Sequence, residues 1–132
     1  MPELTQEMKD MIGSQQCFVG TTSKDGVPNV APKRSTRVLD DSTLIFNEGT
    51  GGATYQNILD GSKVSVAVVN REVLDGYRFL CRAELQTGGE LYEQAKELSL
   101  KTVGRAPHGV VLLHIEEIHS LKPGPGAGKR IA

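Results

Sequence analysis

Three β-rich segments follow one another in the first fifty residues with no room for a helix between them. They are CFVGTTS at 17–23, VPNVAPKRSTRV at 27–38 and TLIFNE at 43–48. The KDG and LDDS stretches that join them have the composition of tight turns, whereas a parallel crossover needs about a dozen residues or more. Consecutive segments are therefore expected to pair antiparallel, and a doubly wound α/β sheet is disfavoured.

The remainder of the chain predicts three further strands and three helices. Alternating or continuous apolar residues indicate the strands, and apolar residues at a 3–4 residue spacing indicate the helices. The strands are expected at 63–70, 77–86 and 109–121, and the helices at 3–14, 54–61 and 90–103. In the last helix, Leu91, Ala95, Leu98 and Val103 form one apolar stripe.

Hairpins with inserted helices favour a mainly β fold in which six antiparallel strands close into a small barrel. A length of 132 residues suits a single domain covering 1–132. Within it, 1–14 would form an N-terminal helix. The Gly- and Pro-rich stretch 122–132 would be a flexible tail or one that clasps a partner.

Charge, apolar run length and cysteine positions together argue against several classes of protein. Fifteen basic and 16 acidic residues give a net charge of -1, which argues against a general nucleic-acid binder. No apolar run is long enough to span a bilayer, and the first residues lack a secretory signal, so we expect a cytoplasmic protein. Cys17 and Cys81 stand in apolar runs and are expected to be buried, reduced side chains.

The histidines do not have the spacing of a metal site. His114 and His119 are five residues apart in a predicted strand, and strict alternation would place them on opposite faces of the sheet. We therefore expect no bound metal.

The glycine-rich stretch NEGTGGATYQN, residues 47–57, separates a predicted strand from a predicted helix. Glycines let the backbone approach a ligand closely, and successive N–H groups in such a turn can bind an anion. A helix beginning near Thr54 would direct its positive end into the same turn. The stretch is either an ordinary turn or a phosphate site.

A basic segment is expected beside this turn. PKRSTR, residues 32–37, lies in a strand predicted to pair with 43–48, and Pro28 and Pro32 imply that this strand is either an edge strand or a bulged one. Alternation would put Lys33, Ser35 and Arg37 on one face and Arg34 and Thr36 on the other. The cations would face solvent, a partner subunit or an anionic ligand, because burying them unpaired is costly.

The sequence contains no recognisable motif of catalytic side chains. No serine stands in a glycine-flanked elbow, and no two carboxylates have an evident partnership. If the protein has an activity, a cofactor is expected to supply the chemistry.

Taken in order, these segments resemble the flavin-binding split-barrel family related to pyridoxamine 5'-phosphate oxidase. The resemblance covers about residues 15–88: a strand ending in a D-G turn, then PNVAP, VLDDSTLIF, a small-residue turn, TYQNI and VSVAV. DGYRFLCRAEL then resembles a strand that often reads G-Y-R-F in that family. No single motif is strong, but the ordered set is specific.

The resemblance implies a six-stranded split barrel that binds flavin mononucleotide (FMN) and works as a homodimer, with FMN at the subunit interface. In such proteins the cofactor contacts come from the second and third strands and the turn after the third. The corresponding residues here are Pro32, Lys33, Arg34, Ser35, Thr36, Asn47, Glu48, Thr50, Gly51, Gly52, Ala53, Thr54, Gln56 and Asn57. Lys33 or Arg34 would neutralise the phosphate, and Thr54 would cap the helix.

Two departures from the family pattern are visible. Many relatives carry a basic residue just before the T-x-x-N helix start, where this chain has Gly52 and Ala53. The true pyridoxamine phosphate oxidases are longer and end in a Trp- and Arg-containing segment, which this chain lacks. The resemblance therefore does not imply a vitamin B6 oxidase.

The function implied by the resemblance is that of a flavin-dependent oxidoreductase or a flavin-carrying electron-transfer protein, whose partner is a small molecule or a redox protein. Tyr77, Arg78 and Phe79 are candidates for the substrate side. Two alternatives stay open. One is a reductase of the same fold that uses the deazaflavin F420. The other is a non-catalytic dimeric module that holds flavin or haem.

Overall fold

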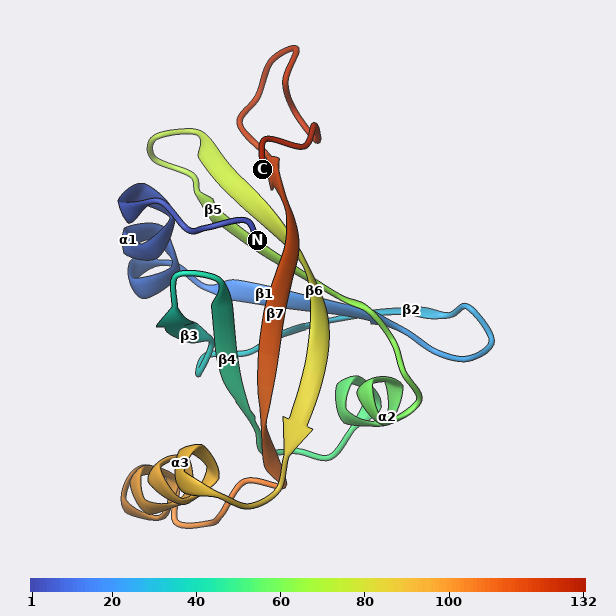
Figure 1. Cartoon of the computed structure of the whole chain (residues 1–132), viewed down its shortest axis with the longest axis vertical. Coiled ribbons are helices and arrows are strands. Elements are labelled where there is room, and N and C mark those ends of the chain that lie inside the picture. The colour runs from blue at the N-terminus through green and yellow to red at the C-terminus, as the bar shows by residue number, and fades with distance from the viewer.

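The computed structural model describes residues 1–132 and contains one antiparallel sheet of seven strands with three helices. The strand order across the sheet is β2-β1-β5-β6-β7-β4-β3 (Figure 1). The strands are β1 (Cys17–Thr22), β2 (Pro28–Pro32), β3 (Arg37–Asp40), β4 (Thr43–Glu48), β5 (Val64–Asn70), β6 (Asp75–Gln86) and β7 (Gly109–Ser120). The helices are α1 (Gln6–Ser14), α2 (Ala53–Leu59) and α3 (Glu90–Thr102).

The mainly β, antiparallel split-barrel fold expected from the sequence is confirmed, with one strand more than predicted. The segment 27–38 is not a single strand, because residues 33–36 form a turn in which the backbone N–H and the hydroxyl of Thr36 both donate to the Lys33 carbonyl. β2 pairs only with β1, and β3 pairs only with β4. The expected face alternation from Lys33 to Arg37 is therefore wrong.

The two edge strands of the sheet are consecutive in the chain. β2 and β3 stand at opposite ends of the strand order, yet only the turn 33–36 separates them. The sheet must therefore curl back on itself, and this turn spans the opening of the barrel. The edge position predicted from Pro28 and Pro32 is confirmed for β2.

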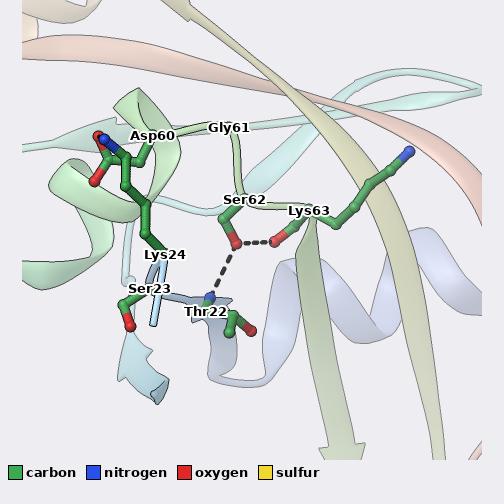
Figure 2. Close-up of a pocket in the computed structure, with 7 residues that line it drawn as sticks. All are labelled: Thr22, Ser23, Lys24, Asp60, Gly61, Ser62 and Lys63. Atoms are coloured by element: carbon green, nitrogen blue, oxygen red, sulfur yellow. Dashed lines mark hydrogen bonds and ion pairs between the residues drawn. The ribbon is translucent and has the colours of Figure 1, made fainter. Parts of the chain in front are cut away.

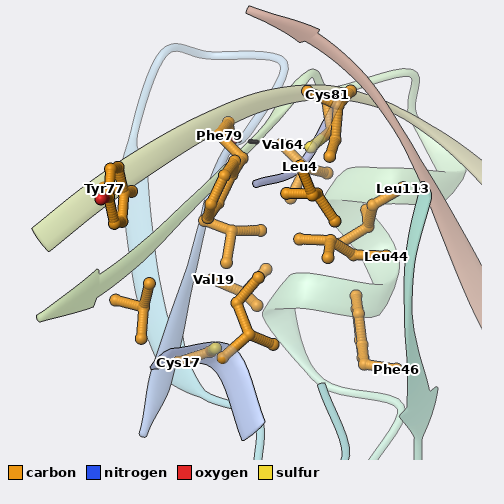
Figure 3. Packing of buried hydrophobic residues seen from close by; sticks show 14 of the residues in the cluster. Leu4, Cys17, Val19, Leu44, Phe46, Val64, Tyr77, Phe79, Cys81 and Leu113 are labelled. Atoms are coloured by element: carbon orange, nitrogen blue, oxygen red, sulfur yellow. Dashed lines mark hydrogen bonds between the residues drawn. The ribbon is translucent and has the colours of Figure 1, made fainter. Parts of the chain in front are cut away.

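The inside of the barrel is filled by alternate residues of the strands. Figure 3 shows these side chains pointing into a common interior from several strands. Fully buried members include Val19, Phe46, Val66, Phe79 and Leu113. Removal of this apolar surface from water is the main favourable contribution to folding, at about 25 cal/mol per Å².

Helices cover the two ends and one outer face of the sheet. α1 begins at a capping box formed by Thr5 and Met8 and contributes Met8, Met11 and Ile12 to the core. α3 packs Leu91 and Ala95 against the outer face of β4 and β7. The apolar stripe predicted for this helix is only partly buried, because Leu98 and Val103 stay exposed.

Both cysteines lie in the barrel core as free thiols, as predicted. Burial raises the pKa of Cys17 to about 11 and the pKa of Cys81 to about 12. Because the thiolate is the reactive form, about one thousandth or less of either thiol is ionised at pH 8. We expect no reaction of the native protein with a disulfide reagent at pH 8, and two equivalents after denaturation. A fast equivalent in the native state would contradict this burial.

The prediction that His114 and His119 lie on opposite faces of the sheet is wrong, because β7 carries a bulge. Leu80 pairs with Glu117 and Cys81 with Ile115, so Glu116 is the extra residue. The bulge shifts the alternation by one position, and Ile115 and Ile118 both enter the core. His114 and His119 consequently share the outer side. No group of three or more His, Cys, Asp or Glu side chains could hold a metal ion.

The C-terminal segment folds back along the end of β7. The backbone N–H of Ser120 donates to the Lys129 carbonyl, and that of Ile131 donates to the Ile118 carbonyl. Arg130 and His119 form an isolated antiparallel β-bridge.

None of the three helices is long and apolar enough to cross a membrane.

Candidate functional site

The turn at the barrel opening and the glycine-rich turn after β4 line a common pocket of about 260 Å³. The loop after α3 closes its third side. The lining residues are Pro32, Lys33, Arg34, Ser35, Asn47, Gly49, Thr50, Ser99, Val103, Arg105, Ala106 and Pro107. The pocket therefore brings together the basic segment and the start of the glycine-rich stretch, as the sequence predicted.

Glu48 is the buried anion of this region. Its side chain is 0% exposed at the end of β4. The carboxylate Oε1 accepts hydrogen bonds from the backbone N–H of Thr50, the Thr50 hydroxyl and the backbone N–H of Gly51, at 3.2, 3.1 and 3.2 Å. Two backbone donors of the expected phosphate cradle are thus already bound to a carboxylate of the chain itself.

Lys33 is the cation that balances this buried charge. Its ammonium lies 3.2 Å from Glu48 Oε2, an oxygen that accepts no hydrogen bond from any other group. The lysine side chain is only 11% exposed and also lies over the Phe46 ring. The charge of Lys33 is therefore largely neutralised within the protein, and the ion pair ties the β2–β3 turn to the end of β4.

Arg34 and Arg105 line the same pocket without a carboxylate partner. Both are exposed, and neither takes part in a salt bridge. Arg37 is also without a carboxylate, but its guanidinium donates to the Ser35 carbonyl at 2.8 Å and to Asn47 Oδ1 at 3.2 Å. The positive charge available at the pocket therefore comes from Arg34 and Arg105.

The second half of the glycine-rich stretch mainly positions α2. Gly51 has φ +67° and lies beneath the His108 ring, where a Cβ would come within 3.0 Å of Nε2. The helix cap is Gly52, so the expectation that Thr54 caps the helix is wrong. Thr54 is buried and accepts a hydrogen bond from Asn29, because α2 packs over the barrel end.

The remaining predicted residues lie outside the pocket lining. Asn57 is buried and donates to the Thr21 hydroxyl, which anchors α2 to β1. Gln56 bonds Asp60 on the exposed side of the helix, Ala53 opens the helix, and Thr36 is buried in the β2–β3 turn.

Arg105 and His108 were not singled out from the sequence. The backbone N–H of His108 donates to the Glu48 carbonyl at 2.7 Å, which holds the 104–108 loop against the glycine-rich turn. The only signal was the composition of GRAPHG, a basic residue and a histidine in a loop rich in Gly and Pro. Nothing local indicates that this loop returns to residue 48.

A second hollow, between the β1–β2 turn and the α2–β5 turn, is a weaker candidate. Figure 2 shows its polar lining, with the side chain of Lys63 directed away from Ser62 and Lys24 beside Asp60. Both lysines are paired, Lys24 with Asp60 and Lys63 with Glu116. No unpaired charge in this hollow is left for a ligand.

Comparison with known proteins identifies the family to which the fold belongs. The sequence model of the pyridoxamine 5'-phosphate oxidase family matches residues 4–122. The chain belongs to this FMN-binding split-barrel family. An uncharacterised protein of Methanocaldococcus jannaschii is 37% identical over 134 residues, which are 98% of this chain and 89% of that protein.

Two solved structures of the family are similar in both sequence and shape. HupZ of Group A Streptococcus is 47% identical and superposes with a TM-score of 0.84 over 95% of this chain and 99% of its own. A pyridoxamine 5'-phosphate oxidase-like protein of Lactobacillus delbrueckii is 34% identical, with a TM-score of 0.78 over 89% of this chain and 94% of its own. An FMN-binding protein of Syntrophomonas wolfei, 18% identical, shares the fold with a TM-score of 0.75.

Proposed function

We propose that the chain binds FMN and acts as a flavin-dependent oxidoreductase or electron-transfer protein. The observation that carries the proposal is a pocket at the barrel opening whose two exposed arginines, Arg34 and Arg105, have no carboxylate partner. Family membership supports the choice of flavin. Guanidinium groups bind phosphate through paired, charge-assisted hydrogen bonds.

The residues present fit a phosphate at the rim of the pocket better than one in the glycine-rich turn. Arg34 and Arg105 would hold it, while Lys33 and the N–H groups of Thr50 and Gly51 stay bound to Glu48. Asn47 and Ser35 offer neutral polar groups next to the arginines. Bound FMN would supply hydride or electron transfer, so no nucleophilic side chain is required.

A homodimer is the second part of the proposal. The outer face of β1, β2 and β5 is covered by no helix and exposes large apolar side chains: Phe18 is 45% exposed and Val30 is 69% exposed. Small neighbours, Gly20 and Ala67, leave this face open to close approach by another sheet. Apolar patches of this kind mark interaction surfaces.

Val30→Asp is therefore expected to convert the proposed dimer to a monomer, because it would bury a carboxylate within the apolar face. Light scattering during size-exclusion chromatography measures the mass. Val73→Asp is the matched control, since Val73 is 63% exposed in the β5–β6 turn. A wild-type monomer at micromolar concentration would rule out the dimer.

The experiment that tests the flavin is the visible absorbance of freshly purified protein, followed by identification of the compound that heating releases. We expect FMN, either retained or taken up on titration. Released F420 would favour the deazaflavin reductase, although that cofactor's acidic tail calls for a longer basic groove than this pocket has. A colourless protein that takes up no flavin would refute the proposal.

A haem-binding module is a second candidate, favoured by one observation. The side chain of His108 is exposed next to the pocket, and neither ring nitrogen has a hydrogen-bond partner. An imidazole nitrogen without a hydrogen-bond partner is available to ligate a haem iron. A Soret band that appears on haem titration and is lost in His108→Ala would support haem binding over flavin binding.

The cytoplasmic location expected from the sequence stays a prediction.

A further inference from the structure

A larger hollow adjoins the proposed flavin pocket on the outside of the barrel. It lies between α3 and the β3–β4 hairpin and measures about 430 Å³. Its lining residues are Arg34, Ser35, Thr36, Arg37, Val38, Leu39, Ile45, Asn47, Leu91, Gln94, Ala95 and Leu98. A volume of this size suits a small organic molecule.

The floor of this hollow is apolar and stays partly uncovered. Ile45 and Ala95 pack together beneath it. Leu98 belongs to the apolar stripe of α3, yet it is 60% exposed, and Leu39 is 36% exposed on the β3 side. Two leucines from separate elements therefore present apolar surface to the same hollow, and an apolar ligand would remove that surface from water.

The mouth of the hollow is positively charged. Arg34 and Arg37 line it, and neither has a carboxylate partner. Desolvation lowers the pKa of the Arg37 guanidinium from its ordinary value, and the groups it contacts, the Ser35 carbonyl and the Asn47 amide, are neutral.

The glutamates of α3 do not compensate this charge. Glu90, Glu93 and Glu97 line a separate hollow along the helix, and none of them lines the one with the arginines. An anion at Arg37 would therefore gain the uncompensated charge without meeting a carboxylate in the lining.

We propose that this hollow binds a small amphipathic anion, a carboxylate on an aliphatic body such as a medium-chain fatty acid. The carboxylate would bond the Arg37 guanidinium, and the chain would lie against Leu39, Ile45 and Leu98. The hollow shares Arg34, Ser35 and Asn47 with the proposed flavin pocket, but Arg37, Leu39, Ile45 and Leu98 line only the hollow. Decanoate binding therefore requires no bound flavin and can be tested separately from the proposed function.

The test is calorimetric titration of the whole protein with decanoate, below the concentration at which it forms micelles. We expect one site per chain. Arg37→Gln should weaken decanoate at least about tenfold, the loss of one charge-assisted hydrogen bond to a carboxylate. Leu98→Ser should weaken it several-fold. Arg130→Gln and Leu59→Ser are matched controls, an exposed arginine and an exposed leucine elsewhere, and should bind decanoate as the wild type does.

Four results would overturn the inference. Decanol binding as tightly as decanoate would reduce the site to apolar adhesion. Equal loss in Leu98→Ser and Leu59→Ser would make the binding non-specific. Competition between FMN and decanoate at one site would merge the hollow with the flavin pocket. Absence of decanoate binding, together with a Leu98→Asp variant that dissociates a dimer, would show that a second copy covers the hollow. Decanoate binding in a protein that takes up no flavin would leave this inference standing while the proposed function fails.

Discussion

Lys33→Met is expected to lower the free energy of unfolding by about 3–5 kcal/mol, because it leaves the Glu48 carboxylate buried without its cation. The carboxylate is fully buried, and its Oε2 has no hydrogen-bond donor, only the ammonium at 3.2 Å. The three donors on Oε1 cannot replace a full charge. Urea denaturation at pH 7 measures the loss as a shift of the midpoint with an unchanged slope.

The double variant Lys33→Met/Glu48→Gln separates the buried charge from simple loss of packing. It removes both charges, so most of the stability lost in Lys33→Met should return. Lys63→Met is the matched control: Lys63 pairs with Glu116 at the surface, and exposed pairs contribute about 0–1 kcal/mol. If Lys33→Met costs no more than Lys63→Met, the Lys33–Glu48 pair does not stabilise the barrel opening.

The parts of the fold that depend on local sequence signals could be predicted, whereas those that depend on long-range contacts such as the Lys33–Glu48 pair could not. Most strand segments and their antiparallel pairing through short turns could be predicted, because short turns and period-two alternation are local signals. The position of the 33–36 turn against the end of β4 could not, since it depends on a contact between Lys33 and Glu48, residues fifteen positions apart. The bulge at Glu116 was equally invisible, because β6 and β7 fix it only when they pair.

The site was predictable in part for the same reason. Lys33, Arg34, Asn47 and Thr50 were expected together, because two short hairpins bring their segments side by side. Arg105 enters the pocket through the pairing of β7 with β4 and the bond from His108 to Glu48. Sequence patterns carry no signal for such long-range closure. The binding of the glycine-rich turn to the carboxylate of Glu48 could not be predicted either, since a glutamate next to glycines is common in sequences.

Replacing both Arg34 and Arg105 with glutamine is expected to weaken FMN binding about a hundredfold or more. Each guanidinium bond to a charged group contributes about 1.5–3 kcal/mol, and no other unpaired cation lines the pocket to replace them. Fluorescence quenching of FMN on titration with protein measures the dissociation constant. The control pair is Arg71→Gln/Arg82→Gln, two exposed arginines away from the pocket.

Riboflavin distinguishes the phosphate from the ring in this experiment. It carries the same isoalloxazine without the phosphate, so the Arg34/Arg105 variant should bind riboflavin as the wild type does. Added salt should weaken FMN binding to the wild type more than to the variant, because the arginines lie at the exposed rim where ions screen them. Equal losses for FMN and riboflavin would mean that these loops hold the ring. The phosphate would then have to be held elsewhere, and Glu48 would need to release Lys33 and the glycine-rich turn to accept it.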